Sequence, residues 1–358
     1  MDQLNTDDKK KLYSLFSNIK DEMKGKSLDV KSTSDVLIID ALNLFIRVWS
    51  VSPYMNEDGI HTGGVSGFLK SLGAAIRLLS PTKCILVFDG SGGSLKRRKL
   101  YPEYKNKRKT KVRLNRTYVD NCSNDDEEKN LKKQLIRTVN YLDYLPLTVM
   151  AIDNVEADDV IAYLALDKFK DSSVTIMSSD KDFLQLASDR VKIWSPVKKK
   201  LYGCAEILME YGISCQNFIN YRILEGDTSD NIDGIPGAGL KTIIKCFPIF
   251  TDPRRYTTDE ICNYSDSHKG RYKLYDTILE NKHILERNYA LMQLNSSEIQ
   301  GFTQLRINEI VDTTFTRLNR FEFSKLVTED KIWNNIPNYQ IWLSENFGKL
   351  DNFVKVVK

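Results

Sequence analysis

The stretch VLIIDALNLFIR at residues 36–47 decides the fold class. Its first part, VLIID, is an unbroken apolar run that ends in an acid, which is typical of a strand buried on both faces of a sheet. A helix is expected to follow over residues 41–48. The same unit, an apolar run that ends in an acid, recurs as CILVFD at residues 84–89 and as VTIMSSD at residues 174–180. Three buried strands with acidic ends are therefore expected.

Helical patterns separate these strands. The further expected helices cover residues 65–79, 120–145 and 155–169, and the further expected strands cover residues 146–152 and 191–194. Strands that alternate with helices predict an α/β fold with a mostly parallel central sheet flanked by helices. Ligands of such sheets gather at the carboxyl ends of the strands. Because Asp40, Asp89 and Asp180 stand at these ends, an acidic site is expected there.

The composition is that of a globular chain. A length of 358 residues corresponds to about two domains, and 41% hydrophobic with 28% charged residues is ordinary. The six cysteines form no C-x-x-C pair, which argues against structural zinc and a secreted disulfide scaffold and suits a reducing cytosol. No signal peptide is recognised, and the most apolar run, residues 36–51, is too short to span a bilayer. We therefore expect a cytoplasmic protein that does not associate with a membrane.

Three parts are expected along the chain. Residues 1–35 form an N-terminal extension, residues 36–204 an α/β core and residues 205–358 a helical C-terminal region. Apolar residues of the extension recur at helical spacing and predict one amphipathic helix: Leu12, Leu15, Phe16, Ile19 and Met23. This helix either covers the protein's own domain or binds a partner, and the sequence leaves both readings open.

Nine acids in five segments are candidate metal ligands: Asp40, Asp89, Glu156, Asp158, Asp159, Asp180, Asp182, Asp227 and Asp230. Carboxylates that converge repel one another unless cations neutralise them. Hard oxygen ligands select Mg²⁺ or Mn²⁺ over zinc. Two such ions about 4 Å apart can activate a water and stabilise the leaving oxygen during attack on phosphorus.

Most of these acids also have a simpler interpretation. Glu156, Asp158 and Asp159 stand in the first turn of a helix, where acids commonly pair with the helix dipole. Asp227 and Asp230 can be ordinary turn and cap residues. The coincidence of all five segments is what favours a metal site.

A basic segment, KRRKLYPEYKNKRKTKVRLNR, covers residues 96–116. Glu103 is its one acid, and Tyr101 and Tyr104 are interleaved. A run of charges is usually a solvated face. Beside an acidic metal site it can also neutralise phosphates and stack a terminal base, and both readings stay open.

A glycine-rich loop, GDTSDNIDGIPGAGLKT, covers residues 226–242. Gly234, Gly237 and Gly239 allow tight turns and present backbone N–H groups at a helix N-terminus, where phosphate is favoured. The loop is therefore a candidate phosphate-binding element.

These segments, in this order, resemble the flap endonuclease (5′ nuclease) superfamily, with the phage 5′→3′ exonucleases, also called phage ribonuclease H, as the nearest group. The resemblance covers residues 36–245. It implies a PIN-like core over residues 36–204 with a basic helical arch at about residues 93–135. It also implies a helix-hairpin-helix element over residues 226–245, within the helical region.

The resemblance assigns roles to matched residues. The first metal would be held by Asp40, Asp89, Glu156 and Asp158, with Asp159 close by, and the second by Asp180, Asp182, Asp227 and Asp230. Arg97 and Lys105 would be catalytic and contact the scissile phosphate, and Tyr104 would stack a base. Further DNA contacts would come from Arg98, Lys107, Arg108, Gly234, Gly237, Gly239 and Lys241.

The resemblance also implies an activity. It is a structure-specific 5′ nuclease, a 5′→3′ exonuclease or flap endonuclease that hydrolyses phosphodiester bonds with two or more Mg²⁺ ions, for which Mn²⁺ would substitute. A K⁺ ion is expected at the glycine-rich loop. The expected substrates are DNA with 5′ flaps or ends and RNA–DNA hybrids, as in primer removal during replication. The chain is expected to act as a free-standing monomer of phage origin in the host cytoplasm, with single-strand binding protein or a sliding clamp as partners.

Sequence features argue against three other functions. A non-catalytic junction-binding module on the same fold would lack metal ligands, and none is missing here. A phosphatase with an aspartyl nucleophile requires a second acid two residues after the first, whereas Ala41 and Leu42 follow Asp40. A compact ribonuclease of the related four-acid class would lack the glycine-rich loop and the basic segment.

Overall fold

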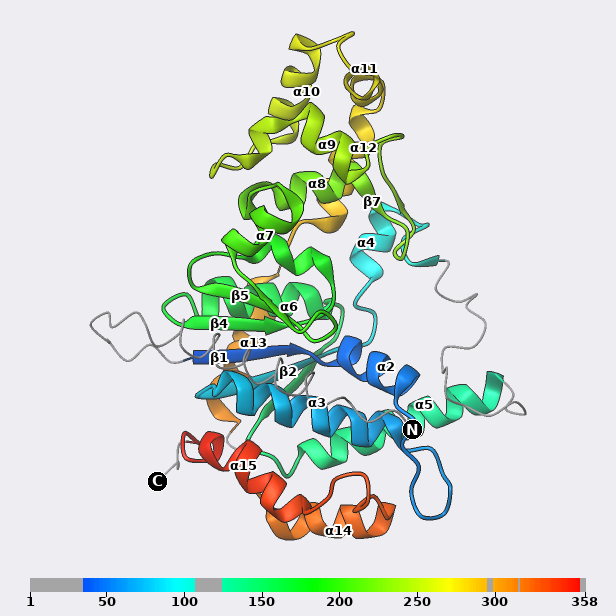
Figure 1. Ribbon diagram of the computed structural model, residues 1–358, viewed down its shortest axis with the longest axis vertical. Coiled ribbons are helices and arrows are strands. Elements are labelled where there is room, and N and C mark those ends of the chain that lie inside the picture. The colour runs from blue at the N-terminus through cyan, green and yellow to red at the C-terminus, as the bar shows by residue number, and fades with distance from the viewer. Residues whose placement is uncertain (1–34, 107–123, 295–298, 315, 355–358) are drawn as a thin grey trace, which may run out of the picture. The chain divides into compact units, whose positions relative to one another are not determined.

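The computed structural model describes residues 35–106, 124–294, 299–314 and 316–354 (Figure 1). The segment Ser34–Lys358 forms one compact unit, separate from Met1–Thr33. The amphipathic helix expected in residues 1–35 and the basic residues Lys107 and Arg108 lie outside the described residues. Their roles stay predictions.

A six-stranded sheet forms the centre of the compact unit. Its order is β3-β2-β1-β4-β5-β6, and all neighbouring strands are parallel except β5 and β6. The strands are β1 (Asp35–Asp40), β2 (Lys83–Asp89), β3 (Thr148–Ile152), β4 (Ser173–Met177), β5 (Val191–Ser195) and β6 (Lys200–Tyr202). The predicted fold class, a mostly parallel sheet flanked by helices, is confirmed. The antiparallel β6 was not predicted.

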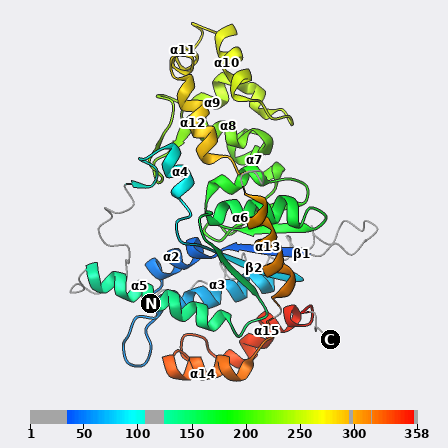
Figure 2. The same cartoon turned by 180° about the vertical axis from the view of Figure 1, so that it is seen from behind.

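Helices cover both faces of the sheet (Figures 1 and 2). Along β1, Val36 and Ile38 belong to one hydrophobic core and Leu37 and Ile39 to the other, because successive side chains of a strand alternate between its faces. The first core includes α6 (Ala157–Tyr163) with its π-helical continuation η2 (Leu164–Lys168), α7 (Cys204–Tyr211), α8 (Phe218–Glu225), α9 (Leu240–Cys246), α10 (Thr258–Ser267), α11 (Lys273–Glu280), α12 (Lys282–Met292) and α13 (Gly301–Thr313). The second core includes α2 (Ala41–Val51), α3 (Gly63–Leu79), α5 (Asn124–Leu142), α14 (Arg320–Asp330) and α15 (Tyr339–Asp351).

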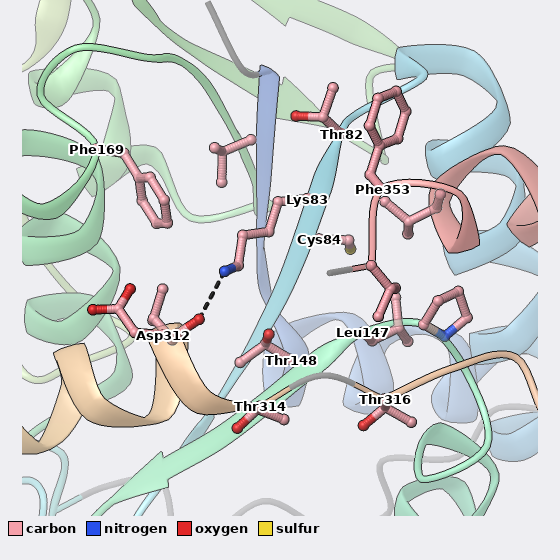
Figure 3. A pocket seen from close by; sticks show the side chains of 15 residues that line it. Thr82, Lys83, Cys84, Leu147, Thr148, Phe169, Asp312, Thr314, Thr316 and Phe353 are labelled. Atoms are coloured by element: carbon pink, nitrogen blue, oxygen red, sulfur yellow. Dashed lines mark hydrogen bonds between the residues drawn. The ribbon is translucent and has the colours of Figure 1, made fainter. Parts of the chain in front are cut away.

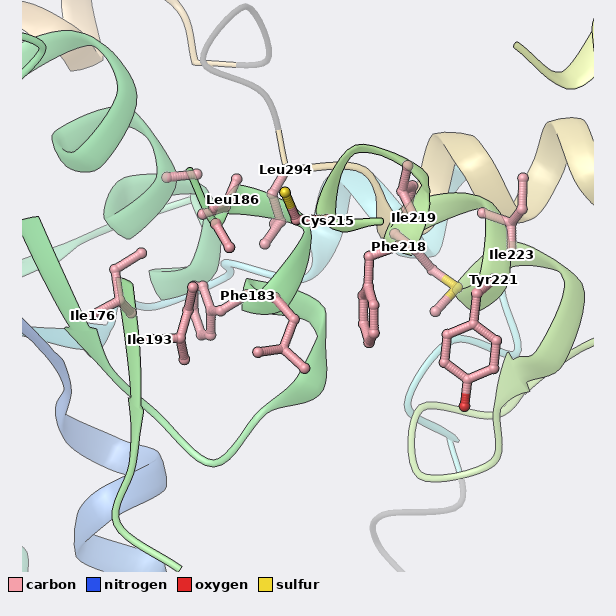
Figure 4. Close-up of a cluster of buried hydrophobic side chains, with 14 of the residues drawn as sticks. Ile176, Phe183, Leu186, Ile193, Cys215, Phe218, Ile219, Tyr221, Ile223 and Leu294 are labelled. Carbon is pink, nitrogen blue, oxygen red and sulfur yellow. The ribbon is translucent and has the colours of Figure 1, made fainter. Parts of the chain in front are cut away.

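Short 3-10 helices join these elements. They are η3 (Lys181–Leu186), η4 (Cys215–Asn217) and η5 (Pro248–Thr251). Phe183 and Leu186 of η3 are buried in one cluster with Ile176 of β4, Ile193 of β5 and Phe218 of α8 (Figure 4). This packing fixes the segment that follows β4 against the helices on that face, which matters for the acids that η3 carries.

The last two helices pack on the sheet side that carries α2 and α3. Phe323 of α14 and Phe347 of α15 are fully buried in the same core as Phe68 of α3. Arg137 of α5 donates from Nε to both oxygens of Asp330, at 2.8 and 3.0 Å, and so joins α5 to the end of α14. The expected division of the chain at residue 204 stays a prediction.

Two further features concern cysteines and membranes. Cys204 and Cys215 form a disulfide, which the cysteine spacing did not predict. The turn between α7 and η4 places their Cα atoms 5.1 Å apart, a distance that could not be predicted from the sequence pattern. Across the described ranges, no helix combines the length and apolar character that crossing a bilayer requires.

Candidate active site

The strand order places a topological switch point between β1 and β4 at the carboxyl edge of the sheet. The chain moves from β1 to β2 on one side and returns to β4 on the other, so the loops after β1 and β4 diverge to opposite faces. Asp40 ends β1, Asp89 ends β2, and Asp180 follows β4 by three residues. The sequence prediction that these acids share one edge is therefore met by the topology.

Asp40 is almost completely buried at this edge. Its Oδ1 accepts the backbone N–H of Asn43 at 3.3 Å, which caps α2, and its Oδ2 accepts the hydroxyl of Ser178 at 2.9 Å. Burial raises the pKa of the Asp40 carboxyl to about 7, and the charges of Asp180 and Asp89 contribute to the rise. These carboxylates are thus close enough to repel one another.

Glu156 occupies the N-cap position of α6 without a capping hydrogen bond from its side chain, and it is 2% exposed. Its Oε2 accepts from the Tyr104 hydroxyl at 3.0 Å and from Lys105 Nζ at 3.0 Å, and Arg97 Nη1 lies 3.1 Å away. Burial alone would raise its pKa, but the charges of Lys105 and Arg97 outweigh burial and hold the pKa below its usual range. The other oxygen, Oε1, is buried without a hydrogen-bond partner. A buried carboxylate oxygen without a hydrogen-bond partner is suited to coordinate a cation.

The other two acids of α6 differ in their surroundings. Burial raises the pKa of Asp158 well above its usual value, and the charges of Asp40 and Asp180 add to the rise. Asp159 instead forms a two-point pair with Arg97, at 2.7 and 2.9 Å. The structure therefore brings Asp158 to the strand-end acids and leaves Asp159 beside them.

Asp89 is the exposed member of this group. Its Oδ1 accepts the backbone N–H of Ala157 at 3.1 Å, which joins the end of β2 to the first turn of α6. The first carboxylate group thus comprises Asp40, Asp89, Glu156 and Asp158.

A second carboxylate group lies on η3 and on the hairpin after α8, formed by β7 (Gly226–Asp227) and β8 (Ile232–Asp233). Asp180 caps η3 by accepting the backbone N–H of Asp182 at 2.8 Å. Burial raises the pKa of Asp180, and among the charges that raise it further are those of Asp227 and Asp230. All four acids assigned to the second metal therefore lie near one another.

Arg222 of α8 joins two of these acids and was not foreseen. Its Nε donates to Asp182 at 2.6 Å and its Nη2 to Asp227 at 2.7 Å. The side chain is 5% exposed. The available sequence signal was an arginine within the apolar stretch just before EGD, which alone does not identify its partners.

Lys105 connects the two carboxylate groups. Its Nζ lies 3.0 Å from Glu156 of the first group and 3.8 Å from Asp230 of the second. Its backbone N–H donates to the carbonyl oxygen of Asp230 at 2.8 Å, and its φ is +57°. Tyr104, expected to stack a base, is 3% exposed. That role requires the ring to be uncovered and stays a prediction.

The basic segment begins with α4 (Leu95–Leu100), which carries Arg97 and Arg98. Arg97 Nε donates to the carbonyl oxygen of Leu291 in α12 at 2.7 Å, so this guanidinium joins α4, α6 and α12. Nε of Arg98 is buried without a hydrogen-bond partner. Contacts of Arg97 and Arg98 with DNA stay predictions.

The glycine-rich loop connects the β7–β8 hairpin to α9. A Cβ on Gly234 would lie 2.1 Å from the carbonyl oxygen of Glu225, so only glycine fits there. Gly237 has a φ of +85° and open space around it, and Gly239 precedes the first turn of α9. Lys241 is exposed on that turn. This arrangement of α8, hairpin and α9 matches the expected helix-hairpin-helix element.

The donor set suits a hard divalent cation. Within the described part of the chain, no three acidic, histidine or cysteine side chains form a ready-made metal cage. Arg97, Lys105 and Arg222 instead pair with four of the carboxylates, Glu156, Asp159, Asp182 and Asp227. Mutual repulsion among the carboxylates and the unpartnered Oε1 of Glu156 are nevertheless the conditions under which oxygen ligands take up Mg²⁺ or Mn²⁺.

A separate cavity of about 350 Å³ lies at the opposite edge of the sheet (Figure 3). It is lined by residues at the starts of strands, among them Val36, Lys83 and Thr148. Nζ of Lys83 donates to the carbonyl oxygen of Val311 at 2.7 Å and so caps the end of α13. None of the predicted site residues lines this cavity.

Comparison with known sequences gives a consistent family. Residues 35–212 match the family model for the 5′-3′ exonuclease, N-terminal resolvase-like domain. The chain is 31% identical over 210 residues to a 5′-3′ exonuclease of Aquifex aeolicus, a match that covers 58% of this chain and 66% of the relative. It is 29% identical over 221 residues to DNA polymerase I of Bacillus subtilis, covering 60% of this chain and 23% of the relative. The matched segment therefore spans less than two thirds of either relative.

Solved structures share the fold. A bacteriophage T5 5′-exonuclease variant aligns with a TM-score of 0.57 at 19% identity, covering 78% of this chain and 98% of the other. A bacteriophage T5 flap endonuclease, in a pseudo-enzyme-product complex with DNA and metal ions, aligns with a TM-score of 0.56 at 20% identity, covering 83% of this chain and 99% of the other. These alignments show the shared fold, and the sequence match over residues 35–212 shows that the chain belongs to the 5′-3′ exonuclease family.

Proposed function

We propose that this chain is a metal-dependent, structure-specific 5′ nuclease that hydrolyses phosphodiester bonds in DNA with 5′ flaps or 5′ ends. The observation that carries the proposal is the pair of adjacent carboxylate groups at the carboxyl edge of the sheet. Lys105 bridges them through Glu156 and Asp230, at 3.0 and 3.8 Å. Two groups of oxygen ligands on either side of a cationic side chain suit a phosphodiester placed between them.

The proposed ligands follow the two groups. Asp40, Asp89, Glu156 and Asp158 would hold one Mg²⁺ ion, and Asp180, Asp182, Asp227 and Asp230 the other, with Mn²⁺ able to substitute. When bound, the two ions supply a water of lowered pKa and stabilise the leaving oxygen. Asp159 positions Arg97 rather than a metal, since both its oxygens contact that guanidinium at 2.7 and 2.9 Å.

Cationic side chains would act on the phosphate itself. The ammonium group of Lys105 is shared between carboxylates here, and a phosphate oxygen offers it an equivalent partner once cations neutralise those acids. Arg97 is more firmly held, because Asp159 and a backbone carbonyl engage three of its N–H groups. We therefore assign charge stabilisation at the scissile phosphate to Lys105 and a supporting role to Arg97.

The duplex would be held away from the site of cleavage. Gly234, Gly237 and Gly239 shape a loop that presents backbone N–H groups, with Lys241 exposed beside it, and phosphates or a K⁺ ion would bind there. Arg98, Lys107 and Arg108 would contact the single strand, and Tyr104 would stack a base. RNA–DNA hybrids as substrates, a task in replication, and partners such as a sliding clamp belong to this proposal.

One experiment tests the activity. End-labelled flap, nicked and RNA-primed duplexes are incubated with the protein in Mg²⁺ or EDTA, and the products are mapped. The wild type should cleave near the 5′ branch only with the metal. Asp180→Asn should lose at least 1,000-fold in rate, an order of magnitude based on the loss of one electrostatic catalytic group. The control Asp189→Asn makes the same change at an exposed position and should cleave normally.

Two outcomes would contradict the proposal. Cleavage that persists in EDTA would remove the metal mechanism. Tight binding of flap DNA without any cleavage would instead favour a junction-binding module on the same fold.

A further inference from the structure

Arg222 is a buried cation at the second carboxylate group. It lies on α8, which contributes Ile219, Tyr221 and Ile223 to the hydrophobic core (Figure 4). Its Nη1 donates to Glu225 at 2.9 Å and to the carbonyl oxygen of Gly226 at 3.2 Å. With the bonds to Asp182 and Asp227, all three nitrogens of the guanidinium are engaged. A side chain held at this many points occupies one position.

The two acids that Arg222 joins come from different elements. Asp182 lies on η3, next to Phe183, whose ring is buried in the core, whereas Asp227 lies on β7 beyond α8. Without a fixed cation between them, the two carboxylates would repel each other and turn apart.

The geometry leaves one oxygen of the two carboxylates for a metal ion, because Oδ1 of Asp227 accepts the backbone N–H and the hydroxyl of Ser229, each at 2.7 Å. Arg222 engages Oδ1 of Asp182 and Oδ2 of Asp227, one oxygen of each carboxylate. Oδ2 of Asp182 therefore stays outside the pair. The planar guanidinium fork sets both the distance and the orientation of its partners, which the point charge of a lysine would not do.

We propose that Arg222 is a positioning residue that holds Asp182 and Asp227 at one spacing before any cation or DNA arrives, and so sets the affinity of the second carboxylate group for a divalent cation. The inference rests on the proposed function for its metal assignment. Arg222 touches neither substrate nor scissile phosphate in this role. It acts through the two carboxylates.

Binding of Mn²⁺ to the protein without DNA, measured by electron paramagnetic resonance, tests the proposal directly. The wild type should bind two ions of unequal affinity. Arg222→Lys keeps the charge and loses the fork, and Arg222→Gln loses both. Each should weaken one of the two sites at least tenfold and leave the other unchanged. Arg254→Gln, which breaks the exposed pair with Glu260, is the matched control and should bind like the wild type.

A second readout separates positioning from stability. The Mg²⁺ midpoint of flap cleavage at saturating DNA should rise for Arg222→Lys by a similar factor, and high Mg²⁺ should restore turnover. Melting temperature in EDTA reports whether each variant is folded, and the lysine variant keeps the test valid if the glutamine variant is not.

Three results would overturn the inference. The first is wild-type Mn²⁺ affinity in Arg222→Lys, and the second is equal weakening of both sites. The third is a wild type that binds no Mn²⁺ without DNA. The proposed nuclease function fails separately: a protein that binds two Mn²⁺ ions, loses one in Arg222→Lys and yet cleaves no substrate would retain this inference and lose the function.

Discussion

Replacement of Lys105 by methionine isolates the cation that lies between the two carboxylate groups. Methionine keeps an apolar stem of similar length and removes the ammonium group, which donates to Glu156 at 3.0 Å and lies 4.8 Å from the centre of the Tyr104 ring. Glu156 Oε2 would still accept the Tyr104 hydroxyl at 3.0 Å and lie 3.1 Å from Arg97. The backbone bond from residue 105 to Asp230 would also remain. The fold should therefore persist.

The size of the effect follows from the distances. At 3.0 Å and an effective dielectric constant of about 20, the attraction between Lys105 and Glu156 is about 5 kcal/mol before the desolvation of both groups is subtracted. A net loss of about 1–3 kcal/mol of stability in the metal-free protein is expected for one charged hydrogen bond. If the same ammonium stabilises the transition state, turnover should fall about 100- to 1,000-fold, or roughly 3–4 kcal/mol.

The change also has a pH signature. Lys105 is the strongest influence that lowers the pKa of Glu156, so its removal must raise that pKa. A carboxylate with a lowered pKa stabilises the fold above its ordinary pKa, and this contribution is lost as the pH falls through the folded-state value. Acid unfolding of Lys105→Met in EDTA should therefore begin at a higher pH than that of the wild type.

The assay compares single-turnover rates at saturating enzyme with DNA affinity measured by fluorescence anisotropy in Ca²⁺. Lys199→Met is the matched control, because Lys199 is an exposed lysine with a φ of +50°, close to the +57° of Lys105. A large loss of rate with little change in affinity is expected. A pure loss of affinity at unchanged rate would refute the catalytic assignment and leave Lys105 as a DNA-positioning contact.

Three further substitutions test other parts of the account. Gly237→Val, at a φ of +85°, should weaken duplex binding at least several-fold without changing Mn²⁺ binding. The control Gly270→Val, at a φ of +78° with equally open space, should bind the duplex normally. Equal duplex affinity in the two variants would refute the role of the loop. Gly234→Ala should destabilise the fold by about 2–4 kcal/mol in urea unfolding, an order of magnitude typical of a backbone clash, and a wild-type midpoint would contradict the 2.1 Å approach to Glu225. Asp40→Asn should abolish cleavage yet raise the melting temperature in EDTA above pH 7, because burial raises the pKa of Asp40 from 3.8 to about 7 and the ionised carboxylate therefore destabilises the folded protein. The gain should shrink as the pH falls below 7 and vanish below about pH 4, where Asp40 is protonated in the folded and the unfolded protein alike, and a pH-independent change would contradict this reasoning.

The sheet and its acidic edge could be predicted because both follow from local patterns. VLIID and CILVFD are apolar on both faces and form β1 and β2 within one residue of the expected bounds, whereas β4 ends at Met177, three residues before Asp180, where the expected strand VTIMSSD ends. A parallel sheet then places the acids after these strands at one edge without further information. For the same reason the helices over residues 41–48 and 65–79 were found as α2 and α3.

Features that depend on distant segments could not be predicted. Arg222 joins η3 to β7 and has no spacing pattern, so only the folded chain identifies its partners. Tyr104 is buried in the hydrophobic core and its hydroxyl donates to Glu156, a contact between distant segments that the sequence of the basic segment does not reveal. The packing of α14 and α15 in the core that contains α3 likewise could not be predicted, because the sequence of residues 205–358 predicts only a helical region.

The proposed metal site requires that carboxylates from five segments converge on divalent cations. Anomalous diffraction from crystals soaked in Mn²⁺ measures this most directly. We expect two peaks at the carboxyl edge of the sheet, one bounded by Asp40, Glu156 and Asp158 and the other by Asp180, Asp182 and Asp230. Peaks confined to other surfaces, or none near Asp40 and Asp180 at saturating Mn²⁺, would contradict the assignment of this edge as the metal site.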